Sequence, residues 1–131
     1  LTASAVDCSS GDIIQALTVP ADSVILWAGM QVTESATQNT GTDATITLGT
    51  AVDPDEYITA FDIDGATDLV YAPTVAQAGV LVNPAADTLD LTFAGSGATF
   101  TAGKLRVFAM LMDVSEVGDH TAQTVDRDTL A

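Results

Sequence analysis

Val24–Glu34, the stretch Val-Ile-Leu-Trp-Ala-Gly-Met-Gln-Val-Thr-Glu, decides the fold of this chain. Side chains of a β-strand point alternately to the two faces of a sheet. One face of this stretch carries only apolar side chains, namely Val24, Leu26, Ala28, Met30 and Val32. The opposite face begins with Ile25 and Trp27 and turns polar at Gln31. The pattern predicts a long strand, apolar on both faces in its first half and on one face in its second half.

Shorter segments with β character occupy much of the remaining chain. They recur at spacings of about ten residues and are separated by Gly, Pro, Asn and Asp. These segments are Ile13–Val19, Ala44–Leu48, Thr67–Tyr71, Val80–Val82, Thr88–Ala94, Ala98–Thr101 and Lys104–Asp113. Many short strands with such turns are typical of an antiparallel sandwich. The sequence therefore predicts an all-β fold, a single antiparallel β-sandwich that is jelly-roll-like.

One segment carries a helix signal instead. Asp53 suits a helix cap, Pro54 suits the first helical position, and Glu56 completes a capping box. The apolar residues that follow at helical spacing are Tyr57, Ile58 and Phe61. We expect one short helical turn over residues 54–61.

The chain of 131 residues is short enough to be one domain. We expect an N-terminal arm at 1–11, the β-sandwich at 12–113, and an extended C-terminal tail at 114–131. The expected core consists of Leu26, Met30, Val32, Ile46, Leu48, Leu89, Leu91, Phe93, Leu105, Val107 and Leu111.

The formal net charge of −15, from 3 basic and 18 acidic residues, excludes whole classes of partner. Nucleic-acid affinity depends on Lys and Arg, and anionic lipid surfaces attract the same residues. No apolar run approaches the roughly 20 residues of a membrane span. We therefore expect no nucleic-acid and no membrane partner. The acidity itself favours solubility first and attraction to a basic partner second.

No set of residues points to catalysis, a cofactor or a metal. Cys8 and His120 could form a nucleophile and a base, but both lie in the expected terminal segments, which lack rigid support. The acidic stretch Asp53–Asp68 contains Asp62-Ile63-Asp64-Gly65, but the later positions of a calcium loop do not match. A cation bound among these oxygens stays an open alternative. We expect no catalytic, cofactor or metal site, and a protein that is not an enzyme.

A second apolar face sets this chain apart from a simple sandwich. Its residues are Ile25, Trp27, Phe108, Met110 and Met112. Loops could cover these side chains, or they could form an interface between copies of the chain. The interface hypothesis predicts a homo-oligomer whose long termini clamp neighbouring subunits.

The order of these elements resembles the head decoration, or cement, proteins of tailed bacteriophages. The segments that carry the resemblance are Ile13–Val24, Ile46–Thr50 followed by Asp53–Ile58, Asp87–Phe93 and Ala102–Val107. The resemblance covers about residues 12–113 as a pattern of elements, and the segment after Asp113 is not part of it.

The resemblance implies a virion structural protein that binds the outer surface of a capsid and stabilises it. It implies a homotrimer seated at three-fold positions, with the major capsid protein as partner and no catalytic residues. Such a protein would be assembled in the host cytoplasm. The alternative from another class is a phage tail or fibre module that binds host-surface glycans, and a hydrolase ranks third.

Overall fold

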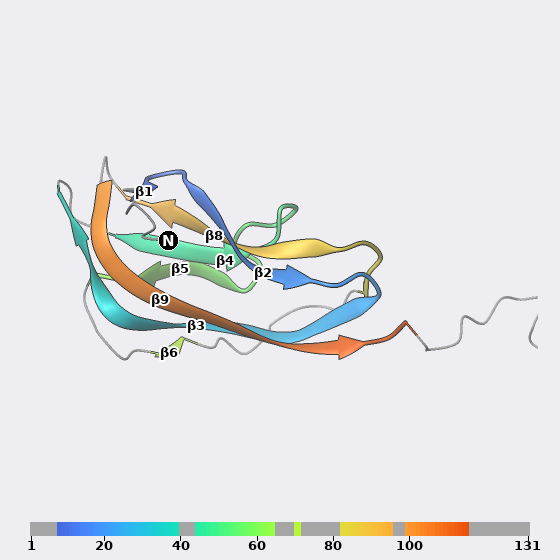
Figure 1. The fold of residues 1–131 in the computed structure, drawn as a ribbon. Coiled ribbons are helices and arrows are strands. Elements are labelled where there is room, and N and C mark those ends of the chain that lie inside the picture. The colour runs from blue at the N-terminus through green and yellow to red at the C-terminus, as the bar shows by residue number, and fades with distance from the viewer. Residues whose placement is uncertain (1–7, 40–43, 65–69, 72–81, 96–98, 116–131) are drawn as a thin grey trace, which may run out of the picture.

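The computed structural model describes residues 8–39, 44–64, 70–71, 82–95 and 99–115, and these ranges contain nine strands and no helix. The strands are β1 (Cys8–Ser9), β2 (Ile13–Val19), β3 (Ser23–Gln38), β4 (Thr45–Gly49), β5 (Ile58–Asp62), β6 (Val70–Tyr71), β7 (Val82–Asn83), β8 (Asp87–Ala94) and β9 (Thr99–Asp113). Figure 1 shows them stacked as two layers.

The strand order is that of a jelly roll. One sheet has the order β1-β9-β3-β6, with β7 also paired to β3, and the other has the order β2-β8-β4-β5. All of these pairs are antiparallel. Without the short β7, the chain visits the two sheets as the eight strands of two Greek keys do. The expected antiparallel, jelly-roll-like sandwich is confirmed.

The longest feature of the fold is the antiparallel pair β3–β9, which runs the length of one layer (Figure 1). Its register extends from Ser23 opposite Asp113 to Gln38 opposite Phe100. The sequence predicted two strands, Ala98–Thr101 and Lys104–Asp113, in place of β9. The strand continues through Gly103, which has a φ of 139°. A Cβ there would lie 3.0 Å from the Cα of Ala36, so this close approach requires glycine.

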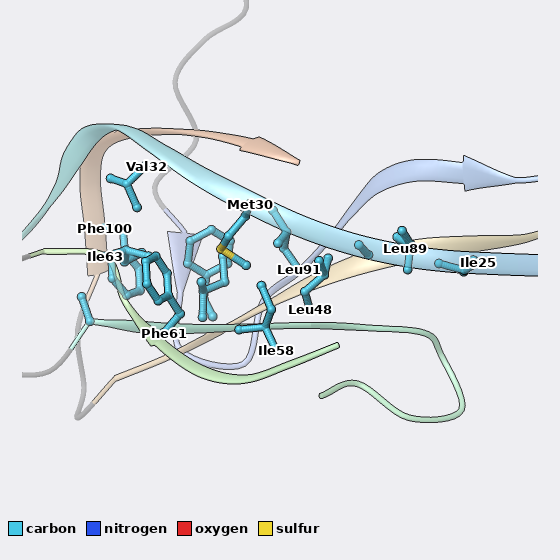
Figure 2. Packing of buried hydrophobic residues seen from close by; sticks show 14 of the residues in the cluster. Ile25, Met30, Val32, Leu48, Ile58, Phe61, Ile63, Leu89, Leu91 and Phe100 are labelled. Atoms are coloured by element: carbon cyan, nitrogen blue, oxygen red, sulfur yellow. The ribbon is translucent and has the colours of Figure 1, made fainter. Parts of the chain in front are cut away.

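The hydrophobic core lies between the sheets (Figure 2). Seven of the expected core residues are buried, namely Met30, Val32, Ile46, Leu48, Leu89, Leu91 and Phe93. Leu105 and Val107 are half-buried and pack against this cluster. The aromatic rings of Phe93 and Phe100 join the two sheets, with centroids 5.1 Å apart.

At the start of β3, the side chains that face the core are not the ones expected from simple alternation. The partner residue moves from Leu111 to Met110 while β3 moves from Ile25 to Trp27, so Leu26 is the extra residue of a β-bulge. Ile25 therefore enters the core, whereas Leu26 is 39% exposed. Leu111, also expected in the core, is likewise 39% exposed. The placement of Leu26 in the core was wrong because the bulge inverts the alternation of β3. The placement of Leu111 was wrong for another reason: it shares a face with Ile25 but lies near the end of β9, where it is partly exposed.

The helical turn expected at 54–61 is also wrong. The Glu56 amide donates to the carbonyl oxygen of Asp53, which closes a single turn. The Tyr57 amide then donates to the carbonyl oxygen of Leu48 at 2.9 Å, and Ile58 begins β5. Ile58 is fully buried, so packing in the sheet outweighs the local capping signal.

The N-terminal strand begins inside the segment expected to be an arm. Cys8 and Ser9 form β1, opposite Phe100 and Thr99 of β9. A turn then carries the chain to β2, held by the Gly11 amide, which donates to the carbonyl oxygen of Phe93 at 2.7 Å. At the other end, β9 stops at Asp113.

A matched pair of valines tests the core. Val32 is fully buried and Val52 is 91% exposed. We expect Val32→Ala to lower the free energy of unfolding by about 2–3 kcal/mol, through lost burial and a cavity. Val52→Ala should change it by less than about 0.5 kcal/mol. Urea unfolding of both variants measures this, and equal effects would contradict the assigned core.

Candidate functional site

The outer surface of the β3–β9 pair carries a row of apolar side chains, which we call the apolar face. Residues opposite each other in an antiparallel pair share a face of the sheet. Trp27 lies opposite Met110, Val24 opposite Met112 on β9, and Val24 opposite Val82 on β7. The apolar face comprises Val24, Trp27, Val82, Phe108, Met110 and Met112, of which Val24 is already buried within the chain and Val82, Met110 and Met112 are exposed.

The centre of the apolar face is an aromatic pair. Phe108 lies opposite Gly29, which has no side chain to occupy the neighbouring position. The ring of Phe108 instead meets that of Trp27, with centroids 5.0 Å apart and planes inclined at 31°. Both side chains are half-buried. Tilted aromatic pairs at this distance add to the stability gained by burial alone.

Four of the five residues expected at an interface lie on the apolar face. Met110 is 57% exposed and Met112 is 46% exposed, and Trp27 and Phe108 lie beside them. Ile25 does not belong with them, since the bulge at Leu26 places it in the core. The sequence missed Val82, because nothing in a short segment indicates pairing with the start of β3.

The apolar face becomes polar toward the other end of the pair. The guanidinium of Arg106 donates to the side-chain oxygen of Gln31 at 3.3 Å. Next, the ammonium group of Lys104 lies 2.7 Å from the carboxylate of Glu34. A hydrogen bond from Lys104 to Glu34 and the attraction between their charges raise the pKa of Lys104. Both side chains are well exposed, so this ion pair stabilises the fold little.

Among the described residues, a cleft of about 550 Å³ lies between β2 and β9. Its apolar lining includes the core side chains Leu91, Phe93 and Phe100. Cys8 of β1 also lines it, and Glu34 and Lys104 contribute the charged part. The lining is thus mainly apolar, with the Glu34–Lys104 ion pair at its border.

The acidic stretch that follows β4 is used for local structure. The side-chain amide of Gln38 donates to the carboxylate of Asp64 at 2.8 Å, and the hydroxyl of Ser35 donates to the Asp64 carbonyl at 2.6 Å. The Asp64 amide donates to the carboxylate of Asp62. These bonds tie the turn after β5 to β3. Among the residues that the structure describes, no three His, Cys, Asp or Glu side chains are grouped to hold a metal ion.

The structure does not test the pairing of Cys8 with His120 as nucleophile and base. Cys8 is half-buried on β1. His120 lies outside the described residues, as does Asp68 of the acidic stretch.

The outer surface of the other sheet contains a buried carboxylate. Asp90 is only 7% exposed and lies opposite Gly49. A Cβ on Gly49 would collide with the backbone of Asp53 and Pro54, so the loop between β4 and β5 covers this part of the sheet. The hydroxyl of Thr47 holds the loop by donating to the Pro54 carbonyl at 2.8 Å. The glycine ending β4 is the one sequence signal for this close approach.

Comparison with models of known protein families, with curated proteins and with solved structures found no match. Within the described ranges, no helix has the length and apolar character needed to cross a membrane.

Tyr57, in the loop between β4 and β5, is expected to make the protein less stable at alkaline pH. Burial, and secondarily the charge of Glu56, raise the pKa of Tyr57 to about 12 from 10.0. Below pH 10, folded and unfolded chains both keep the phenol proton. Between pH 10 and about pH 12 the unfolded chain loses the phenol proton while the folded chain keeps it. The free energy of unfolding therefore falls as pH rises through this range. Urea unfolding at successive pH values should show a smaller alkaline loss for Tyr57→Phe than for the natural chain, and an identical loss would refute this assignment.

Proposed function

We propose that this chain is a structural protein of a tailed-phage virion, which binds the outer surface of the capsid and stabilises it. It acts as a homotrimer, with the major capsid protein as its partner, and it carries out no catalysis. The observation that carries the proposal is the apolar face, on a jelly-roll domain whose order of elements resembles that of decoration proteins. Jelly rolls occur in viral capsid proteins as well as in lectins, so the fold is compatible with this role without deciding it.

The apolar face has the composition of a protein interface. Aromatic residues and Met are enriched at interface centres, whereas Asp, Glu and Lys are depleted there. The face presents Trp27, Phe108 and two methionines, and none of its six residues is charged. A surface of this kind is best buried against another protein. In a closed ring of three copies, every copy buries its apolar face against a neighbour.

The acidic remainder of the chain supports attachment to a second, different surface. The net charge of −15 makes copies repel one another wherever their carboxylates approach. Contact between copies is therefore favoured at the uncharged face, and the acidic surfaces are left for a basic region of the capsid. Screening by salt at a Debye length of about 8 Å weakens both the repulsion and this attraction.

One observation favours the second candidate, a tail or fibre module that binds host glycans. Sugar rings stack on aromatic side chains, and Trp27 and Phe108 form a pair at the surface. The two flanking methionines favour a protein partner instead, because they supply flexible apolar area without hydrogen bonds for sugar hydroxyls.

The location of the protein in the particle distinguishes these functions. Heads and tails of the phage that encodes the chain are separated, and their proteins are identified by peptide mass mapping. We expect peptides of this chain in the head fraction, in amounts comparable with the major capsid protein. Recovery in the tail fraction alone would overturn the proposal in favour of the glycan-binding module.

The apolar face is tested by placing a charge on it. We expect Met110→Lys to convert the trimer into monomers, because a buried unpaired charge is strongly destabilising at an interface. Val52→Lys, a matched control at an exposed position outside the face, should leave the trimer intact. Analytical ultracentrifugation of the natural chain and both variants measures this. A natural chain that stays monomeric at every concentration would contradict the trimer.

A further inference from the structure

The buried carboxylate of Asp90 has an oxygen that the fold leaves without a partner. Asp90 is 7% exposed, and its Oδ1 atom is buried and accepts no hydrogen bond. Burying a carboxylate oxygen without a donor is costly, so such oxygens in folded proteins are normally paired with a donor, a water or a metal ion. The Oδ1 atom of Asp90 therefore indicates a ligand at this place in the sheet.

A second oxygen without a partner lies on the same face of β8. The Oγ1 atom of Thr92 is buried and makes no hydrogen bond. Asp90 and Thr92 are two residues apart on one strand, so their side chains project from the same face of the sheet. On the neighbouring strand β4, Gly49 lies opposite Asp90 and Thr47 lies opposite Thr92. The two oxygens thus border one patch of the outer surface, at the end of β4.

The loop between β4 and β5 covers this patch with oxygen atoms. The carbonyl oxygens of Asp53 and Pro54 are among the atoms that a Cβ on Gly49 would meet, so they lie over the sheet next to Asp90. Two amides of the loop donate to the Asp53 carbonyl, and Pro54 has no amide hydrogen. The loop therefore presents acceptors to a carboxylate that lacks a donor.

No basic side chain among the described residues lies on this sheet. Lys104 and Arg106, the Lys and Arg that the structure describes, are both on β9 in the other sheet, where they bond Glu34 and Gln31. The loop adds three further acidic side chains, those of Asp53, Asp55 and Glu56. A cation from solution is thus the available source of positive charge for this patch.

We propose that Asp90, Thr92 and the Pro54 carbonyl bind a calcium ion beneath the loop between β4 and β5. Carboxylate, carbonyl and hydroxyl oxygens suit Ca²⁺, which takes roughly six to eight oxygen ligands in flexible geometry and accepts water among them. The Pro54 carbonyl accepts the Thr47 hydroxyl and keeps a second lone pair. The site combines one buried carboxylate with neutral oxygens, so it differs from a group of three acidic side chains, which the described residues lack.

The bound ion ties the loop to the sheet. It satisfies both unpartnered oxygens and offsets the repulsion between Asp90 and the carboxylates of the loop. Because one carboxylate is a ligand, we expect a weak site with a Kd of about 10⁻⁴–10⁻³ M. This role is independent of the virion function proposed above, because it concerns the fold of a single copy.

Thermal unfolding of the full chain tests the site. After treatment with a chelator, about 10 mM CaCl₂ should raise Tm by roughly 5 °C relative to NaCl at equal ionic strength, because the ion binds the folded chain. Asp90→Asn should abolish this rise, since the amide keeps the shape of the side chain, removes its charge and supplies a donor. Asp55→Asn is the matched control, which removes an exposed charge from the same loop and should keep the rise.

Thr92→Val gives a second variant, which keeps the shape of the side chain and every carboxylate. We expect it to raise the Kd for Ca²⁺ about tenfold, through the loss of one neutral ligand. Isothermal titration calorimetry measures this Kd and the number of ions bound to each chain. This measurement decides the proposal even where Asp90→Asn does not fold.

One ion per natural chain, lost in Asp90→Asn and retained in Asp55→Asn, supports the proposal. A natural chain that does not respond to calcium would overturn it and assign the two oxygens to a buried water. An equal rise of Tm in all variants would also overturn it, because it would show general screening of an acidic protein. So would a Thr92→Val variant that binds calcium as tightly as the natural chain.

Discussion

The register of β3 against β9 is the constraint on which the rest of this structure depends. The two strands pair from Ser23 opposite Asp113 to Gln38 opposite Phe100, and each contributes to both surfaces of its sheet. The inner side chains, such as Met30 and Val107, pack against the other sheet, and the outer ones form the apolar face. Because alternation has a period of two, a slip by one residue would exchange these sets. Core and surface are therefore specified together by a single ladder.

The bulge at Leu26 makes this dependence visible. Before it, Ile25 points into the core; after it, Ala28, Met30 and Val32 do. The extra residue lets a stretch with apolar side chains on both phases fill the core and still leave Trp27 outside. Without the bulge, Trp27 would take the inner phase set by Ile25 and displace the close contact between the sheets. The bulge thus reconciles one apolar stretch with two surfaces.

The sequence predicts the strands whose apolar and polar residues alternate clearly, and it does not predict the features that depend on contacts between distant strands. Ile13–Val19 was predicted with the bounds that β2 has, and β4 and β8 within one residue at each end, because alternation alone determines such strands. The bulge escaped prediction because Ile25 and Leu26 are both apolar, so either phase is consistent with a buried strand. The helix expected at 54–61 failed because its capping signals are local, whereas Ile58 is held by burial against distant strands. Four of the five residues expected at an interface, Trp27, Phe108, Met110 and Met112, share the outer face, since Trp27 lies beyond the bulge and the others alternate along β9.

The cleft lies where the two sheets border each other, between β2 and β9. Beside β8, the seven-residue strand β2 continues one sheet, and Ile14 of β2 lies opposite Leu91 of β8. Beside β9, the other sheet continues with β1, of which the structure describes Cys8 and Ser9. Leu91 and Phe93 of β8 line the cleft together with Leu105 and Val107 of β9. Each buried face of a sandwich needs an opposing face, so the side chains at the border of the core also form the apolar lining of the cleft.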